Sequence, residues 1–163
     1  MMILTKQQTT ALQDTANALS VPVEWLYRLI KFESGFNPRV KNPYSSARGL
    51  IQFTDGTARA LGYKDSSDLV DKNRTIERQL RSPVLKYLSQ YAPYPTAQSL
   101  YMAVFYPSFR YVSPDTLFTD TVRSVNPGIA RVSDYVNKVE GVKISPASSA
   151  FFAMLAAAGL FFF

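Results

Sequence analysis

The sequence predicts a mainly α-helical domain, and three observations support this fold class. Apolar residues recur at helical spacing in several segments. Hydroxyl or amide residues followed by proline mark several helix starts, and no segment shows the alternation expected of a half-buried strand. The chain has 163 residues, 47% of them apolar, which suffices for one domain with a core but not for two. We therefore predict one domain over residues 1–141 and a different kind of segment over 142–163.

The first two helices follow from apolar spacing and helix-end signals. We expect a first helix over about residues 6–19 and a second that starts near Pro22, because proline suits the first helical turn. The second helix runs to Glu33, and Gly35 ends it, with Asn37-Pro38 blocking continuation. The inward residues of the first helix are Ala11, Leu12, Ala16 and Leu19.

The middle of the chain contains a loop and two further helix signals. Residues 39–49 are rich in turn formers and basic residues, which predicts an irregular loop. A short helix is expected over about 57–61, with Thr57 as its cap and Gly62 as its end. Ser82-Pro83 has the cap and first-turn pattern of another helix, which must end before Pro93.

Three more starts occur before residue 141. One helix is expected from Thr96 to just before Pro107, and the segment 113–118 repeats the cap-proline signal. A final helix is predicted over 126–141, ended by Gly141. Its apolar stripe consists of Ile129, Val132, Val136 and Val139.

The C-terminal segment has a different composition. No charged residue follows Lys143, and residues 150–163 read "AFFAMLAAAGLFFF". Counted from Pro146 as a helix, the uncharged stretch would span about 27 Å, close to a hydrocarbon core. We expect residues 142–163 to be a linker and a transmembrane anchor, with a lipid membrane contacted through 146–163 and with Lys138 and Lys143 at the headgroups. A buried core helix and an interfacial segment are the alternatives.

Composition excludes several kinds of chemistry. The chain has no cysteine and no histidine, which removes disulfides, thiolate nucleophiles, Ser-His systems and nearly every zinc hydrolase site. No metal or cofactor is expected. The net charge of +6 favours anionic partners such as a bacterial wall. The basic residues are scattered without a run of four, so no specific nucleic-acid partner is expected.

One carboxylate interrupts an apolar stripe. In "LYRLIKFESGFNP" (26–38), Glu33 lies seven, four and three residues after Leu26, Leu29 and Ile30, which places it on the same helix face. A buried carboxylate is costly unless it is paired or neutral. Two interpretations follow: a structural role, as an ion pair with an interior arginine such as Arg48 or as a cap for a loop, or a functional carboxyl with a raised pKa.

The segment after the glutamate favours a functional interpretation. Residues 45–62, "SSARGLIQFTDGTARALG", combine a hydroxyl-rich loop with a glycine turn and with Gln52 between apolar neighbours. A glycine at such a turn permits close approach of the backbone to a ligand.

Four segments together resemble the catalytic domain of soluble lytic transglycosylases, especially the versions carried by bacteriophages. They are "ESGFNP", "SSARGLIQFTDGTARALG", "SLYMAVFYP" and "NPGIARVSDYV", and the resemblance extends over about residues 20–140. It implies a lysozyme-like helical fold that cleaves the β-1,4 bond between N-acetylmuramic acid and N-acetylglucosamine in peptidoglycan. The single catalytic glutamate of the "ES" motif maps to Glu33.

The resemblance also implies a mechanism. Most glycosidases pair two carboxylates, whereas in this family one glutamate acts first as acid and then as base. The sugar's acetamido group assists, its 6-hydroxyl attacks, and the product is a 1,6-anhydro sugar. The position of Glu33 suits this role, because apolar surroundings and a helix C-terminus both raise a carboxyl pKa.

Further substrate-binding residues are inferred from the same motifs. Ser34 matches the serine beside the acid, Gln52 a cleft residue, and Tyr106 a tyrosine whose hydroxyl approaches the glutamate. Each also has a structural interpretation, as a helix end, a buried amide or a core ring. The family often reads "AYN" where residues 104–109 read "VFYPSF". Phe53 and Tyr44 are candidate platforms for sugar stacking.

The functional prediction is a membrane-anchored lytic transglycosylase, in a phage virion membrane or the bacterial envelope, that acts in genome entry or lysis. One alternative is a hydrolytic muramidase of the same fold, for which Asp55 or Asp65 would supply the second carboxylate. Another is a non-catalytic, membrane-bound virion or wall-binding protein.

Overall fold

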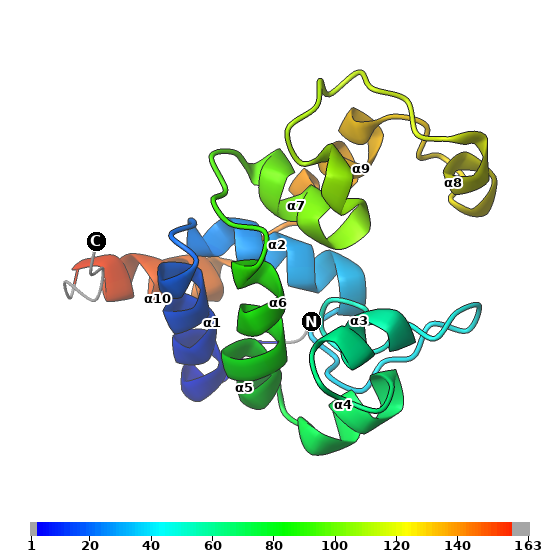
Figure 1. Cartoon of the computed structure of the whole chain (residues 1–163). Coiled ribbons are helices and arrows are strands. Elements are labelled where there is room, and N and C mark those ends of the chain that lie inside the picture. Colours follow the sequence, from blue (N-terminus) through cyan, green and yellow to red (C-terminus); the bar gives the residue numbers. More distant parts are fainter. Residues whose placement is uncertain (1–2, 158–163) are drawn as a thin grey trace.

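The structure is a computed structural model that describes residues 3–157 of the chain. Within this range it contains helices and three isolated β-bridges but no strand, and Figure 1 shows how the helices are arranged. The mainly helical class predicted from the sequence is confirmed. The elements, in chain order, are α1 (Lys6–Ala18), α2 (Val23–Ser34), α3 (Asp55–Ala60), α4 (Ser66–Lys72), α5 (Ile76–Gln79), the π-helix η1 (Leu80–Val84), α6 (Leu85–Ser89), α7 (Ala97–Phe105), the 3-10 helix η2 (Pro107–Phe109), α8 (Asp120–Val125), α9 (Val132–Glu140) and α10 (Pro146–Ala157).

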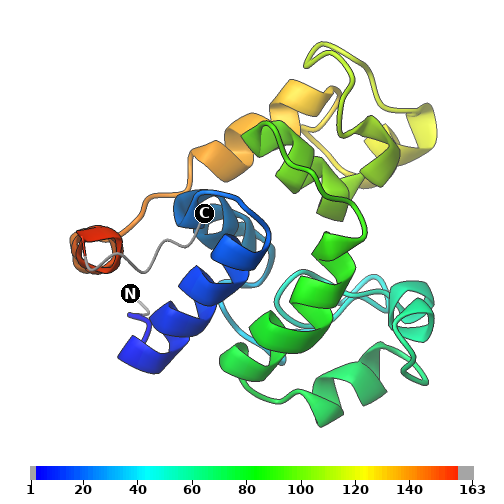
Figure 2. The same cartoon turned by 60° about the vertical axis from the view of Figure 1, so that its left-hand side comes forward.

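Helix α2 lies at the centre of the fold. It packs against α1, α7 and α9, and Figures 1 and 2 both show it between the α1 side of the molecule and the α7–α9 side. Leu26, Leu29 and Ile30 are fully buried, as the apolar spacing predicted. Three other helices therefore fix the position of α2, which carries Glu33 in its last turn.

Threonine caps begin several of the helices. Thr5, Thr54, Thr75 and Thr96 each accept a hydrogen bond from the backbone N–H three residues later, which satisfies a donor that the helix leaves free. The start near Thr96 was predicted. Helix α3 begins earlier than expected, because its cap is Thr54 and not Thr57.

The helix that contains Ser82-Pro83 differs from the prediction. These residues are not a helix start but lie inside a continuous run from α5 through η1 to α6. Proline lacks an N–H and clashes with the preceding α-helical turn. The wider π-helical turn over Leu80–Val84 accommodates Pro83. A serine followed by proline can occur both at the start of a helix and inside a π-helical turn, so the sequence pattern does not separate the two.

Two C-terminal predictions also change. Residues 113–118 form no helix but contain a turn at 114–115 and the bridge of Leu117 with Arg131. The helix in this region is α8, which starts one residue after its cap, Thr119. Asn126 ends α8 rather than starting the next helix, and α9 begins only at Val132. Gly141 ends α9 as predicted.

The described part of the expected membrane anchor packs on the domain. Helix α10 contacts α1, and its Phe152 and Leu155 are buried. Of the residues that the structure describes, no helix combines the length and the apolar character that crossing a bilayer would need. The transmembrane helix predicted over 146–163 is thus unsupported for residues 146–157, where Phe152 and Leu155 bury one side of the helix against the domain. Residues 158–163 lie outside the described range.

Candidate active site

Glu33 lies in the last turn of α2, next to the point where the chain reverses. Gly35 ends the helix with φ +60° and donates its N–H to the Lys31 carbonyl, a left-handed cap that glycine adopts at low cost. Phe36 follows, also with positive φ, and buries its ring against Tyr27 with 5.0 Å between centroids. The helix end is therefore held by a buried aromatic contact.

Helix α9 brings a tyrosine to this carboxyl group. The Tyr135 hydroxyl donates a hydrogen bond to Glu33 Oε1. Its ring is 1% exposed, stacked on Phe105 at 4.3 Å and edge-on to Phe32 at 5.5 Å between centroids. Aromatic rings from α2 and α7 thus hold the phenol, so the hydroxyl is directed at Glu33 by packing.

The surroundings favour the protonated form of Glu33. Burial raises its pKa from 4.5 to about 7, and the hydrogen bond from Tyr135 opposes this rise. No ion pair between described side chains includes Glu33. The interpretation of Glu33 as the partner of an interior arginine is therefore wrong for the described residues. A carboxyl with a pKa near neutrality can both donate and accept a proton.

A second carboxyl between the same helices has a different environment. Tyr101 donates a hydrogen bond to Glu140 Oε1 at 2.7 Å, while Arg28 Nη1 lies 3.5 Å from Glu140 Oε2. These contacts join α7, α9 and α2. Both carboxyls accept from a buried tyrosine, but among the described residues only Glu140 of the two has an ion pair with a cation. The missing cation distinguishes Glu33 as a group suited to proton transfer.

Ser34 and Gln52 make local contacts with the backbone. Ser34 Oγ donates to the Ile30 carbonyl at 3.0 Å, one turn earlier in α2. Gln52 has φ +58° and donates its side-chain N–H to the Gly49 carbonyl at 3.1 Å. Non-glycine residues in this conformation are strained and are common at functional sites. Their roles in substrate binding stay predictions.

Tyr106 occupies a different place from the one expected. It ends α7, and its ring contacts Phe109 and Phe118, with centroids 4.6 and 5.6 Å away. Among the described hydrogen bonds, the tyrosine hydroxyl that reaches Glu33 is that of Tyr135. The expected tyrosine–glutamate contact exists, but the residue that makes it lies in the later motif.

The two candidate stacking platforms differ in exposure. Phe53 is 2% exposed and packs against Tyr87, so its ring belongs to the core and cannot offer a face to a sugar. That prediction is wrong, because Phe53, which is paired with Arg48 in an isolated bridge, directs its ring at Tyr87 in the core. Tyr44 is 95% exposed on the 39–49 loop, where its ring is free to contact a ligand.

The close approach at Gly49 is to the protein itself. Gly49 has φ +76°, and a Cβ there would lie 2.7 Å from Gln79 Oε1. Gln79 is fully buried; it accepts from Leu50 N–H at 2.9 Å and donates to the Pro38 and Asn73 carbonyls. Glycine is needed so that this amide can fasten the loop after α2 to the segment between α4 and α5.

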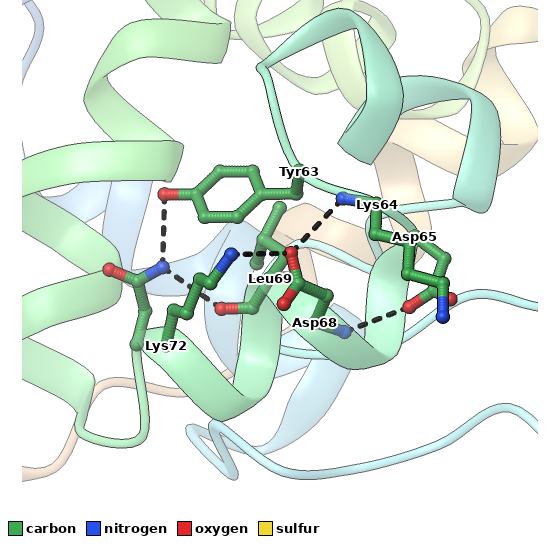
Figure 3. Close-up of polar contacts among 7 residues, drawn as sticks. Tyr63, Lys64, Asp65, Asp68, Leu69 and Lys72 are labelled. Atoms are coloured by element: carbon green, nitrogen blue, oxygen red, sulfur yellow. Dashed lines mark hydrogen bonds and ion pairs between the residues drawn. The ribbon is translucent and has the colours of Figure 1, made fainter.

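Neither candidate for a second carboxylate is directed at Glu33. Asp55 Oδ1 accepts from Ser66 N–H at 3.0 Å, and this contact and that with the Ser66 hydroxyl hold the pKa of Asp55 below its usual range. Asp65 caps α4 by accepting from Asp68 N–H at 2.8 Å, as Figure 3 shows. Both serve local structure. Among the described residues, no group of three acidic side chains is arranged to hold a metal ion.

The sequence interpretation missed Tyr135. Its position in the last motif lies three residues after Val132 and four before Val139, so it shares their inward face. A tyrosine on an apolar stripe needs a partner for its hydroxyl, and this signal could have connected it with the unpaired Glu33. The partner itself could not be read from one helix, since 102 positions separate the two residues.

Comparison with known proteins adds one family. No curated protein matches the chain. A family model described as the transglycosylase SLT domain matches residues 10–85, which include Glu33, Ser34 and Gln52 but not Tyr135. Over α1 to the start of α6, the chain is therefore similar to the transglycosylase SLT domain, a family of the lysozyme-like superfamily.

Proposed function

We propose that this protein is a peptidoglycan lytic transglycosylase in which Glu33 acts as general acid and then as general base. The observation that carries the proposal is the state of Glu33, whose pKa is about 7 and whose described partners include a tyrosine but no cation. The family match over residues 10–85 supports transglycosylase activity on peptidoglycan in general.

The first step uses the protonated carboxyl. Glu33 gives its proton to the bridging oxygen as the bond from C1 of the muramyl sugar to that oxygen breaks, and the acetamido group of the sugar assists. The Tyr135 hydroxyl already donates to one carboxyl oxygen. Its hydrogen bond stabilises the anion that forms when the proton leaves.

The second step returns the proton. The 6-hydroxyl of the muramyl sugar attacks C1, the acetamido oxygen that bonded to C1 in the first step leaves as the C1–O6 bond forms, and ionised Glu33 accepts the proton from O6. The products are a chain end with a 1,6-anhydro ring and a free N-acetylglucosamine end, and no water is consumed. One carboxyl is sufficient, which is consistent with the structural roles of Asp55 and Asp65.

The decisive experiment is product analysis of digested peptidoglycan sacculi by mass spectrometry. Wild type is expected to release anhydro ends, and Glu33→Gln to lose roughly a hundredfold to ten-thousandfold in rate, because general acid–base catalysis contributes that much. Glu24→Gln, the same change in the first turn of the same helix, is the matched control and should keep activity.

Two results would replace the proposal. Reducing ends instead of anhydro ends would identify a hydrolytic muramidase. Wild-type protein that binds sacculi without releasing any fragment would identify a wall-binding protein that retains the fold.

We also propose that the protein opens the wall for a bacteriophage, during genome entry or lysis, from a position at a virion membrane or the bacterial envelope. The support is the likeness of the four motifs to phage-borne versions of the domain and the apolar C-terminal segment. Mass spectrometry of purified virions and of infected-cell envelopes tests it. Absence from both fractions would rule it out.

A further inference from the structure

Helix α10 buries one side against the domain. Ser148, Phe152 and Leu155 are buried, at spacings of four and three that place them on one helix face. Phe152 meets Tyr27 of α2 edge-on, with ring centroids 5.9 Å apart. Ser145 begins the helix by accepting from the Ser148 N–H at 3.2 Å. The helix is therefore seated on the domain through defined contacts.

The opposite side of α10 is apolar and exposed. Met154 is 53% exposed, and the helix carries no charged side chain. Ser149 is the polar residue among its exposed positions, which are Pro146, Ala147, Ser149, Ala150, Ala153, Met154 and Ala157. We call the side formed by Ala147, Ala150, Ala153, Met154 and Ala157 the outer face.

The outer face continues onto the start of the chain. Ile3 is 63% exposed, and a hollow of about 130 Å³ joins it to α10. The residues that line this hollow are Ile3, Leu4, Lys6, Thr9, Ala147, Ser148 and Phe151. Two segments far apart in sequence thus meet at this hollow, which shares Ala147 with the outer face. Exposed apolar groups that gather in this way mark interaction sites.

We infer that the outer face of α10, together with Ile3, is a membrane-contact surface that rests on anionic lipid while α10 stays seated on the domain and lies parallel to the bilayer. The twelve residues of α10 span about 18 Å, well short of a hydrocarbon core of about 30 Å. To cross the bilayer, α10 would have to leave the domain, and Phe152 would lose its contacts there. A helix that lies on the bilayer keeps this packing.

Charge and sequence favour lipid over a second protein copy. Lys6, which lines the hollow, and Lys143, three residues before α10, are both exposed. Lysines near a surface of anionic headgroups each strengthen binding roughly fivefold. The sequence after Ala157 is also wholly apolar, so the chain adds further groups that favour lipid. A second copy would bring the same lysines together.

Vesicle co-sedimentation tests the surface. The probe is vesicles of equal parts phosphatidylcholine and phosphatidylglycerol, with pure phosphatidylcholine for comparison. Met154→Glu and Ala150→Glu are each expected to weaken binding by roughly tenfold or more, since they place an anion in the contact. Val125→Glu is the matched control, because Val125 is 72% exposed on α8; its binding should equal that of wild type.

Label depth tests the orientation. The chain has no cysteine, so Ala147→Cys and Met154→Cys each give one labelling site, seven residues apart on the same face. Quenching by brominated lipids should report equal depths for a helix that lies flat. Depths that differ by about 10 Å would show a crossing helix and overturn the inference.

Other outcomes also contradict it. The inference is contradicted if wild type binds neither type of vesicle. It is also contradicted if Met154→Glu binds vesicles as tightly as wild type does. A dimer in size-exclusion chromatography that Met154→Glu dissociates, without vesicle binding, would assign the face to a second copy. None of these measurements involves glycan cleavage, so they succeed or fail independently of the proposed catalytic role of Glu33.

Discussion

At the scale of single residues, Glu33 has surroundings that disfavour its charged form. Burial raises its pKa, and the hydrogen bond from Tyr135 only partly offsets the rise. Glu140, between the same helices, has Arg28 beside it. A partly buried carboxyl without a cation lowers stability, and such groups are commonly retained where activity needs them. The Glu33–Tyr135 pair leads to two predictions.

The first prediction concerns stability. Because the folded-state pKa of Glu33 is about 7 against an ordinary 4.5, the folded state holds this proton more tightly than the unfolded state. Wild type should therefore lose stability as pH rises from 4.5 to 7. The pKa difference corresponds to about 3 kcal/mol. Glu33→Gln should lack this loss and exceed wild type by up to that amount above pH 7, as measured by denaturant unfolding. Equal pH profiles would contradict it.

The second prediction concerns the pH dependence of catalysis. The Tyr135 hydrogen bond lowers the pKa of Glu33, so Tyr135→Phe should move the alkaline limb of kcat/KM to higher pH. The rate should also fall by about tenfold to a hundredfold, because the anion formed in the first step loses a charged hydrogen bond. Tyr101→Phe, which removes the matching contact to Glu140, should leave the limb in place. A lower melting temperature with an unmoved limb would mean that Tyr135 is only structural.

At the scale of elements, the loop after α2 depends on one buried amide. Gln79 connects this loop to the segment between α4 and α5, and Gly49 leaves room for it. Gly49→Ala should cost about 3 kcal/mol of unfolding free energy, because left-handed strain adds to the clash with Gln79. Gly62 also has positive φ, but a Cβ added there would meet no atom within 4 Å. Gly62→Ala should therefore lose only about 1 kcal/mol of unfolding free energy, from backbone strain alone. Equal losses would show that the clash is relieved.

Helix α10 belongs energetically to the domain. Phe152 is buried against Tyr27, whose ring also contacts Phe36 beside the end of α2. Phe152→Ala should reduce the unfolding free energy by about 3–5 kcal/mol. Met154→Ala, on the outer face of the same helix, should change it by less than about 0.5 kcal/mol. Similar small effects at both positions would mean that α10 is not seated on the domain in solution.

At the scale of the whole molecule, the net charge of +6 should attract the protein to the anionic bacterial wall. Raising salt from 0.1 to 1 M shortens the Debye length from about 10 to about 3 Å. Binding to sacculi should therefore weaken markedly with salt, while binding to uncharged chitin oligosaccharides should not. A salt-independent affinity for sacculi would show that the overall charge has no part in wall recognition.

Several features were predictable because they depend on neighbours in sequence. The buried stripe of α2, its end at Gly35, the cap at Thr96 and the end of α9 at Gly141 all match the structure. These signals act over one or two helical turns, where apolar spacing and backbone donors alone decide the outcome. The position of Glu33 on an apolar face belongs to the same group.

The sequence by itself determined the helical class and placed a carboxyl on the apolar face of a helix, because both follow from the periodicity of apolar residues within helices. Only the tertiary structure decided that Tyr135 is its partner, that Phe53 lies in the core, that Gly49 makes room for Gln79, and that α10 packs on the domain. Each of these depends on contacts between distant segments. The same local sequence pattern can be surrounded by protein, lipid or water, and the tertiary fold decides which of these surrounds it.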